Sequence, residues 1–279
     1  MHLVRFESFY YRYKGNEEYS LNNINLRIKE NNSKFILLAG ETGSGKTSLI
    51  RCMNGLIPQF YAGFYRGKVE IRGKNTTETS IADLSTEVGI VFQNPENQLI
   101  SMNVEHEIAF GLENLGVPKK EISNRIKEVT SLTEIEHILD KAPFELSGGE
   151  QQRVAIASIL VLEPKVLILD EPTALLDPYM AKKIINLLQE IKQEKNITIL
   201  ISEHRLDLIL PFIEQIILMK NGNILEYNSR ENVINGENFQ KLHLNKPIIF
   251  SIFNKLKKEK LFNKNIPASI PEAVKSLNI

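Results

Sequence analysis

The sequence predicts an α/β fold built around a mostly parallel sheet. Two observations carry this prediction: short, continuous apolar runs recur along the chain, and helical periodicity fills much of the space between them. Strands without polar alternation are buried on both faces, and their alternation with helices is typical of parallel sheets covered by helices. A hydrophobic content of 42% also fits a packed globular core rather than a disordered chain.

The predicted elements follow from these patterns in chain order. Residues 4–13 and 21–28 alternate between apolar and polar side chains and are predicted as strands. The continuous apolar runs predict buried strands at residues 35–39, 88–92, 166–169, 197–201 and 216–219. Helical periodicity is found at residues 104–115, 122–132, 151–162 and 179–191. Asn221-Gly222 lies between apolar runs and predicts a hairpin turn.

The chain divides into a main domain at residues 1–243 and a small extension at 244–279. Within the main domain, about residues 94–162 are helical with no clear strand, which predicts an inserted helical subdomain. After residue 243 the chain becomes rich in Lys and Asn, with scattered apolar residues at Ile248, Ile249, Phe250, Ile252, Phe253 and Leu256. Ser269 and Glu272 have the spacing of a capping box before a short final helix.

Charge and cysteine content limit the function classes. Lys plus Arg and Asp plus Glu both number 34, so no net field would hold the chain on nucleic acid or anionic lipid. The single cysteine, Cys52, excludes an intramolecular disulfide and fits a reducing compartment. No apolar run approaches the roughly 20 residues that span a bilayer, and the first residues lack the apolar stretch of a signal peptide. We therefore expect a cytosolic location.

A phosphate-binding loop is predicted at residues 40–47, which read Gly40, Glu41, Thr42, Gly43, Ser44, Gly45, Lys46 and Thr47. The loop follows a buried strand and opens a helix, which is the context that such a motif requires. Its glycines let successive backbone N–H groups face one anion at a helix N-terminus. Lys46 supplies a charge for phosphates, and the Thr47 hydroxyl is placed for Mg²⁺. A glycine-rich turn that binds nothing is the alternative, and this context disfavours it.

Two carboxylates, Asp170 and Glu171, end the apolar run at residues 166–169. The carboxyl end of a strand is where ligands collect in an open α/β sheet. Asp170 is placed to hold Mg²⁺ through water, and Glu171 to orient or deprotonate the water that attacks a γ-phosphate. The alternative is that the pair merely begins a surface turn before Pro172.

A second glycine-rich helix start is predicted at residues 146–153. Ser147 and Glu150 have capping-box spacing, so a well-capped helix is the simplest interpretation. Gly148 and Gly149 argue against it, because glycines weaken the first turn and a cap does not need them. They are explained if the backbone must approach an anion closely.

Taken together, these motifs resemble the ABC ATPase family over about residues 3–240, in the family's order. The family's LSGGQ-type signature reads Leu146 to Glu150 here, with Glu150 in place of the usual Gln. The resemblance implies a RecA-like P-loop core with an antiparallel β subdomain. It also implies that Tyr13, or its competitor Tyr11, stacks on adenine.

Further roles also rest on this resemblance. Gln93 would contact Mg²⁺ and sense the γ-phosphate, residues 174–177 would cross to a second subunit, and His204 would act as the switch histidine. The cofactors are then ATP and Mg²⁺. Two cassettes would sandwich two ATP molecules, each between residues 40–47 of one chain and Ser147, Gly148, Gly149 and Glu150 of the other. The partner cassette is a second copy or a paralogue.

Residues 92–98 and 202–207 further resemble the ATPases of energy-coupling factor importers, which take up vitamins and transition-metal ions. This implies a transmembrane coupling protein and a substrate-binding membrane subunit as partners, and a peripheral position on the cytoplasmic face. A groove around residues 94–98 is expected to receive a cytoplasmic helix of the coupling protein. The alternatives are a soluble ABC protein acting on nucleic acid or the ribosome, and a binding module without hydrolysis. The chain's missing basic surface opposes the first, and its intact Lys46, Asp170, Glu171 and His204 oppose the second.

Overall fold

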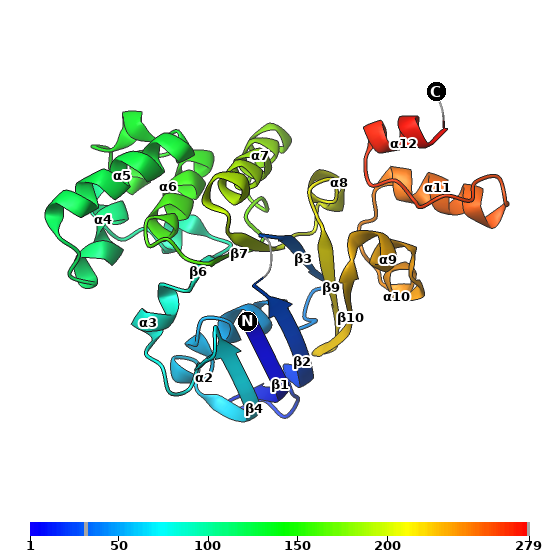
Figure 1. The fold of residues 1–279 in the computed structure, drawn as a ribbon, viewed down its shortest axis with the longest axis horizontal. Coiled ribbons are helices and arrows are strands. Elements are labelled where there is room, and N and C mark those ends of the chain that lie inside the picture. Colours follow the sequence, from blue (N-terminus) through cyan, green and yellow to red (C-terminus); the bar gives the residue numbers. More distant parts are fainter. Residues whose placement is uncertain (31–32, 278–279) are drawn as a thin grey trace.

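A six-stranded sheet forms the centre of the computed structural model, which describes residues 1–30 and 33–277 (Figure 1). Its strand order is β10-β9-β3-β8-β7-β6, and all neighbouring strands are parallel except β10, which pairs antiparallel with β9. The strands are β3 (Phe35–Gly40), β6 (Val88–Val91), β7 (Val166–Asp170), β8 (Thr198–Ser202), β9 (Gln215–Lys220) and β10 (Asn223–Ser229). The prediction of a mostly parallel sheet from five continuous apolar runs is therefore confirmed.

A second, antiparallel sheet of four strands has the order β2-β1-β4-β5. Its strands are β1 (His2–Tyr13), β2 (Leu21–Lys29), β4 (Gly63–Ile71) and β5 (Lys74–Asn75). In β2 the apolar side chains are buried and their polar neighbours exposed, because one face packs on the core and the other meets water. The exposed aromatic side chains Phe64 and Tyr65, for which the sequence favours a β-hairpin over an exposed docking loop, belong to β4.

Every regular element between β6 and β7 is helical. The long helices there are α4 (Val104–Asn114), α5 (Lys119–Thr133) and α6 (Gly148–Leu160), and α7 (Pro178–Lys195) follows β7. The helices before β6 are α1 (Lys46–Cys52), α2 (Leu56–Gln59) and α3 (Ile81–Ser85). The helices after β8 are α8 (Leu206–Ile209), α9 (Arg230–Asn235), α10 (Glu237–Lys241), α11 (Ile248–Lys258) and α12 (Ile270–Leu277). The four long helices agree with the predicted periodic segments to within a few residues.

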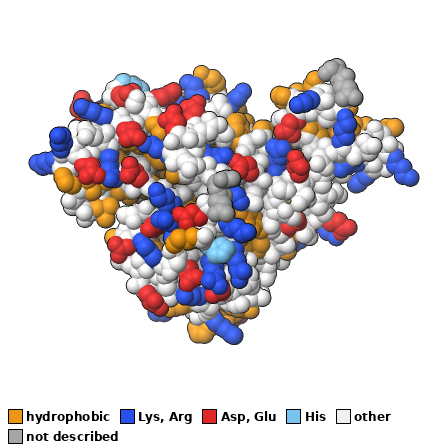
Figure 2. Space-filling model, in the orientation of Figure 1, with side chains coloured by type: hydrophobic (Ala, Val, Ile, Leu, Met, Phe, Trp, Pro, Cys, Tyr) orange, Lys and Arg blue, Asp and Glu red, His pale blue; other side chains and the backbone are white. Residues whose placement is uncertain are grey.

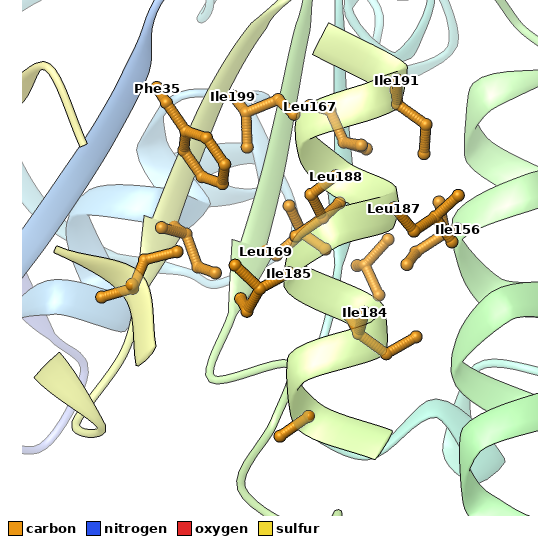
Figure 3. Packing of buried hydrophobic residues seen from close by; sticks show 14 of the residues in the cluster. Phe35, Ile156, Leu167, Leu169, Ile184, Ile185, Leu187, Leu188, Ile191 and Ile199 are labelled. Atoms are coloured by element: carbon orange, nitrogen blue, oxygen red, sulfur yellow. The ribbon is translucent and has the colours of Figure 1, made fainter. Parts of the chain in front are cut away.

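The two faces of the parallel sheet bury different partners. On one face, Ile184 and Leu188 of α7 pack over Leu167 and Ile199 of the sheet, and α6 adds Ile156 (Figure 3). The opposite face packs against the antiparallel sheet in a second hydrophobic cluster. Burial of each such aliphatic side chain stabilises the fold by about 1.5–3 kcal/mol. The carboxyl ends of β3 and β7 are thereby held in a rigid frame.

Helices α11 and α12 lie beside α9 and α10 (Figure 1). Phe250 and Phe253 are buried, and Phe250 packs edge to face on Phe239 at a centroid distance of 5.3 Å. Ile248, by contrast, is 79% exposed. The apolar residues of the predicted tail thus divide between packing on the chain's own helices and facing solvent.

The described part of the chain contains no helix that is both long and apolar enough to cross a bilayer. On the face shown in Figure 2, basic and acidic side chains are interspersed rather than gathered by sign. This pattern matches the equal numbers of acidic and basic residues in the sequence.

Candidate functional site

The loop of residues 40–47 joins β3 to α1, and its glycines are required by the backbone. Gly43 and Gly45 have φ angles of +77° and +100°, in the left-handed region that favours glycine. A Cβ at Gly40 would lie 2.5 Å from the Met219 carbonyl oxygen, and one at Gly45 would lie 2.6 Å from that of Ser20. Neither backbone atom can move aside cheaply, so the loop is closely packed against strand β9 and the residue that precedes β2.

Lys46 is buried in this loop, with 7% of its surface exposed. Its Nζ donates hydrogen bonds to the carbonyl oxygens of Gly40 (2.9 Å) and Glu41 (3.1 Å). Burial lowers the pKa of Lys46, while the carboxylates of Glu171 and Asp170 oppose the shift. The Ser44 hydroxyl is also buried and has no hydrogen-bond partner among the described residues. A cation and a free polar atom in one glycine-lined loop fit a phosphate group.

Asp170 ends β7 next to the loop. Its side chain is buried, and the Thr47 hydroxyl donates to its Oδ2 at 2.9 Å. The Ser202 hydroxyl donates to the other oxygen, Oδ1, at 2.5 Å. Asp170 and Ser202 are register partners on the parallel strands β7 and β8, which explains why the two side chains meet. Asp170 and Thr47, both predicted as metal ligands from distant parts of the sequence, are therefore in direct contact.

Glu171 is half-exposed and held from two sides. Gln93 Nε2 donates to its Oε2 at 3.0 Å, and His204 Nε2 lies 3.0 Å from its Oε1. Its φ of +50° is in the left-handed region, which is uncommon for a residue with a side chain. The Glu171 amide donates to the Ser202 carbonyl oxygen at 3.0 Å, which fixes the turn. The structure thus brings together Gln93, Glu171 and His204, which the sequence placed in three separate motifs.

Two supporting residues were not singled out from the sequence. Besides binding Asp170, the Ser202 hydroxyl accepts a hydrogen bond from the Glu171 amide at 3.1 Å. The buried Glu203 carboxylate accepts from Thr173 Oγ1 (2.5 Å) and from the amide of His204 (2.8 Å), so it fixes the backbone that carries the histidine. A signal was available for both, because polar residues at the carboxyl ends of adjacent parallel strands must converge.

A cavity of about 380 Å³ opens at this point of the molecule, and Thr47, Gln93 and Asp170 are all in its wall. No cluster of three or more His, Cys, Asp or Glu side chains suited to a metal occurs in residues 1–30 and 33–277. Mg²⁺ does not require one, since it usually binds through one or two carboxylates together with water and substrate phosphates. The donor set around the cavity therefore fits Mg²⁺ bound with a phosphate ligand.

The two tyrosines proposed for adenine stacking differ in exposure. Tyr11 is fully buried, and its hydroxyl donates to the Tyr61 carbonyl oxygen at 2.9 Å. Tyr13 is half-buried, and its hydroxyl lies 3.1 Å from Ser48 Oγ in α1. A base cannot stack on a ring with no exposed surface. Only Tyr13 is available for the predicted contact.

The segment from Leu146 to Glu150 forms the start of α6. Ser147 is the N-cap, and its amide and hydroxyl donate to Glu150 Oε2 at 2.8 Å and 2.6 Å. Hydrogen bonds from Ser147 also lower the pKa of Glu150. A Cβ at Gly148 would meet only Leu176 Cδ2, at an ordinary 3.7 Å. The capping box is real, but contacts within the chain do not account for the glycine at 148.

Comparisons with known proteins agree with this geometry. A family model described as ABC transporter matches residues 21–174. An inferred ABC transporter ATP-binding protein of Methanosarcina mazei is 43% identical over 80% of this chain, which spans only 38% of that relative. One from Pyrococcus abyssi is 39% identical over 92% of each chain.

Solved structures resemble the chain as well. CbiO1 from Clostridium perfringens, described as part of the ABC transporter complex cbiONQ, is 34% identical with a TM-score of 0.75 and covers 91% of this chain and 99% of its own. A dimeric cassette, MJ0796, bound to ADP and Pi, is 28% identical with a TM-score of 0.69 and covers 81% of this chain and 98% of its own. The chain therefore belongs to the ABC transporter family as an ATP-binding domain, an ATPase coupled to transport that binds ATP with Mg²⁺.

Proposed function

We propose that this chain energises a membrane importer of the energy-coupling factor type, which takes up a vitamin or a transition-metal ion, from the cytoplasmic face of the membrane. The likeness to CbiO1 of Clostridium perfringens carries this proposal, because it covers 91% of this chain and 99% of that protein at 34% identity. The equal numbers of acidic and basic residues, and their interspersion on the face shown in Figure 2, give no support to a nucleic-acid partner.

In the proposed reaction, residues 40–47 hold the phosphates of ATP. Lys46 turns its ammonium group from the carbonyl oxygens of Gly40 and Glu41 toward the β- and γ-phosphates. Thr47 and Asp170, already in contact, would hold Mg²⁺ together with Gln93. When bound, Mg²⁺ supplies positive charge to the phosphate oxygens. The rest of the loop contributes hydrogen-bond donors to the phosphates. The backbone N–H groups come from Gly40, Glu41, Thr42, Gly43, Ser44 and Gly45, and Ser44 also offers its unpartnered hydroxyl.

Glu171 is the general base of the proposed reaction. Its carboxylate accepts a proton from the water that attacks the γ-phosphorus, while the bond from that phosphorus to the bridging oxygen of ADP breaks. His204, 3.0 Å away, orients the carboxylate and stabilises its charge. Gln93 contacts the other carboxylate oxygen, so it is placed to report the state of the γ-phosphate to the helices that follow β6.

The second half of each site comes from a partner cassette in this proposal. Gly148 is exposed, and no neighbour within the chain requires a glycine there, so its backbone is free to approach a phosphate of the partner's ATP. The other members of this half are Ser147, Gly149 and Glu150. Among the described residues, no hydrogen bond joins residues 147–150 to residues 40–47. Tyr13 completes the nucleotide site by stacking on adenine.

A hollow of about 320 Å³ beside residues 96–101 supports docking to a transmembrane coupling protein. Its wall includes Ile100 and Phe144, which are 70% and 86% exposed, and Met102 nearby is 88% exposed. Exposed apolar side chains around a hollow fit the apolar face of a partner helix. Gln98 itself is turned inward, where it bonds to the backbone of Phe92 and Ile90, so it would position the groove rather than line it.

Cysteine cross-linking tests the proposal directly. Cys52 is the chain's single cysteine and is fully buried, so an introduced thiol is the accessible one. In membranes that contain the full complex, Ile100→Cys and Phe144→Cys should capture a transmembrane subunit. Leu261→Cys, equally exposed at 71% but located after α11, is the matched control and should not. Failure of both groove positions in a complex that still transports would contradict the proposed docking.

A further inference from the structure

One hydrogen bond across 202 residues of sequence joins the phosphate loop to His243, the residue that immediately precedes the C-terminal extension. The backbone amide of His243 donates to Glu41 Oε1 at 2.9 Å. Glu41 is the second residue of the phosphate loop, and its carbonyl oxygen accepts from Lys46 Nζ. One residue therefore contacts both the lysine that would bind phosphate and the segment that leads into α11.

Other contacts of the loop do not replace this one. The Gly222 amide in the β9–β10 turn donates to the Ser44 carbonyl oxygen at 3.0 Å, and Met219 packs against Gly40. These neighbours belong to the edge of the parallel sheet and hold the middle of the loop. Glu41 alone among residues 40–47 makes a side-chain hydrogen bond to the segment after α10.

The segment after α10 is itself firmly joined to the extension. This segment, residues 242–247, is called the connector. Lys246 Nζ donates to the carbonyl oxygens of Gln240 (2.8 Å) and Leu242 (3.0 Å), so the connector is held closed around His243. On its far side, Phe250 of α11 packs on Phe239 of α10. A displacement of the connector would therefore move or loosen the start of α11.

We propose that Glu41 is a positioning residue that fastens the phosphate loop to the C-terminal extension through the His243 amide, so that ATP binding and the order of residues 244–277 are coupled. The proposal rests on the assignment of residues 40–47 as the ATP-binding loop. The His243 bond and neighbouring Lys220 also lower the pKa of Glu41, so its carboxylate is charged at neutral pH. Linkage makes the coupling reciprocal: if ATP orders the extension, an anchored extension must tighten ATP binding.

His243→Pro removes the donor N–H, and His243→Ala keeps it. Leu242 has φ −79° and ψ 141°, a conformation that a residue before proline adopts readily. We expect the Kd for ATP to rise about 3- to 10-fold in His243→Pro, because this variant loses one exposed hydrogen bond to a charged acceptor. His243→Ala should bind as the parent chain does. The double variant Glu41→Ala/His243→Pro should be no weaker than the weaker single variant, because both remove the same bond.

Hydrogen exchange of the α11 amides supplies a readout that a merely structural role would not move. ATP should slow exchange at residues 248–258 in the parent chain and in His243→Ala, and this response should disappear in His243→Pro. If His243→Pro does not fold, the pair Glu41→Ala and Glu41→Gln decides, since Gln retains an acceptor and should keep the response that Ala loses.

Equal ATP affinity and equal exchange response in His243→Pro and His243→Ala would overturn the proposal, as would an intact response in Glu41→Ala. Failure of the loop assignment gives a different result. In that case Lys46→Ala would bind ATP as tightly as the parent chain, whatever residue stands at 243.

Discussion

The phosphate loop and the start of α6 both place glycines ahead of a helix, but different neighbours explain them. At Gly40 and Gly45 an added Cβ would strike a backbone oxygen of the same chain. At Gly149 it would strike only the flexible end of Met180, and at Gly148 it would make an ordinary contact. Glycine in the phosphate loop is thus explained by the folded monomer, whereas no contact within the monomer explains Gly148.

This contrast teaches how the two halves of a shared site can be distinguished in one chain. The half proposed to bind phosphate is preorganised by β3, β7 and β8, and it buries Ser44, Lys46 and Asp170, of which Ser44 has an unpartnered hydroxyl. The half at residues 147–150 is satisfied by its own capping box, and Ser147 and Gly148 are exposed. Substitutions should therefore separate effects on binding by one chain from effects on turnover by a pair.

The largest effect is expected for Glu171→Gln, in the half that contains the phosphate loop. Removing the base should lower kcat by about 10²- to 10⁴-fold while ATP binding is retained, because glutamine keeps the shape but accepts no proton. Single-turnover hydrolysis and equilibrium ATP binding measure the two quantities. His204→Gln is the companion variant and should show a smaller loss. Turnover of Glu171→Gln near the parent rate would remove Glu171 from the proposed reaction.

Lys46→Ala should act on binding itself. The variant loses a charged donor to the phosphates, and we expect the Kd for ATP to rise about 100-fold, or about 2.7 kcal/mol. Isothermal titration at a stated Mg²⁺ concentration measures this change. Lys34→Ala, a half-buried lysine that bonds to Gln215 away from the loop, is the control and should bind ATP normally.

Gly148→Ala tests the outward half and should spare the monomer. We expect turnover to fall about 10-fold or more, since an oriented backbone contact to the transferred phosphate is lost, while ATP affinity of the monomer is unchanged. Gly45→Ala is the contrasting variant, and strain at φ +100° should cost it roughly 1–3 kcal/mol of unfolding free energy.

Specific activity measured at increasing dilution provides the control for the Gly148→Ala and Gly45→Ala variants. Specific activity of the parent chain should fall on dilution as dimers dissociate, because each site needs residues 147–149 of a neighbour. Constant specific activity from a monomer, or parent-like turnover by Gly148→Ala, would show that the site is complete within one chain.

The smallest effect concerns Glu150 and pH. Hydrogen bonds from Ser147 lower the pKa of Glu150 from its ordinary value of 4.5. The capping hydrogen bonds to the Glu150 carboxylate are therefore fully formed above this ordinary pKa, and they are lost as the pH falls through the lowered value. The Ser147 amide shift in NMR should follow this titration. In Glu150→Gln the titration should vanish while the helix start remains. A Ser147 amide that titrates equally in Glu150→Gln would contradict the capping geometry.

Sequence patterns predicted the parallel sheet because its strands are apolar without interruption, which leaves few alternatives. They favoured a β-hairpin around Phe64 and Tyr65 but gave no bounds for β4, whose residues Gly63–Ile71 include a stretch of mostly exposed side chains with no clear pattern. Nor could they decide between Tyr11 and Tyr13, because residues two apart share a face of a strand. Burial separates them, since Tyr11 is fully buried while Tyr13 lies at the strand's end and is half-buried.

The candidate site was predicted residue by residue, but not its contacts. Asp170 and Thr47 were both assigned to Mg²⁺, yet only the fold shows that they bond to each other at 2.9 Å. Ser202 was overlooked because a serine at a strand end is common and gains meaning only from its register with Asp170. The bond between Glu41 and His243 has no sequence signal, because it joins a side chain to a backbone amide 202 residues away.

The backbone of Glu171 has a further consequence for how this chain can evolve. Glycine and asparagine adopt the φ of +50° at this position most easily. Any other residue lowers the free energy of unfolding by roughly 1 kcal/mol or more. A sequence selected for thermal stability alone would drift toward those two at this position. With Glu171 as the proposed base, keeping a glutamate there lowers the fold's small stability margin, so an inactive descendant should be able to melt at a higher temperature than its active ancestor.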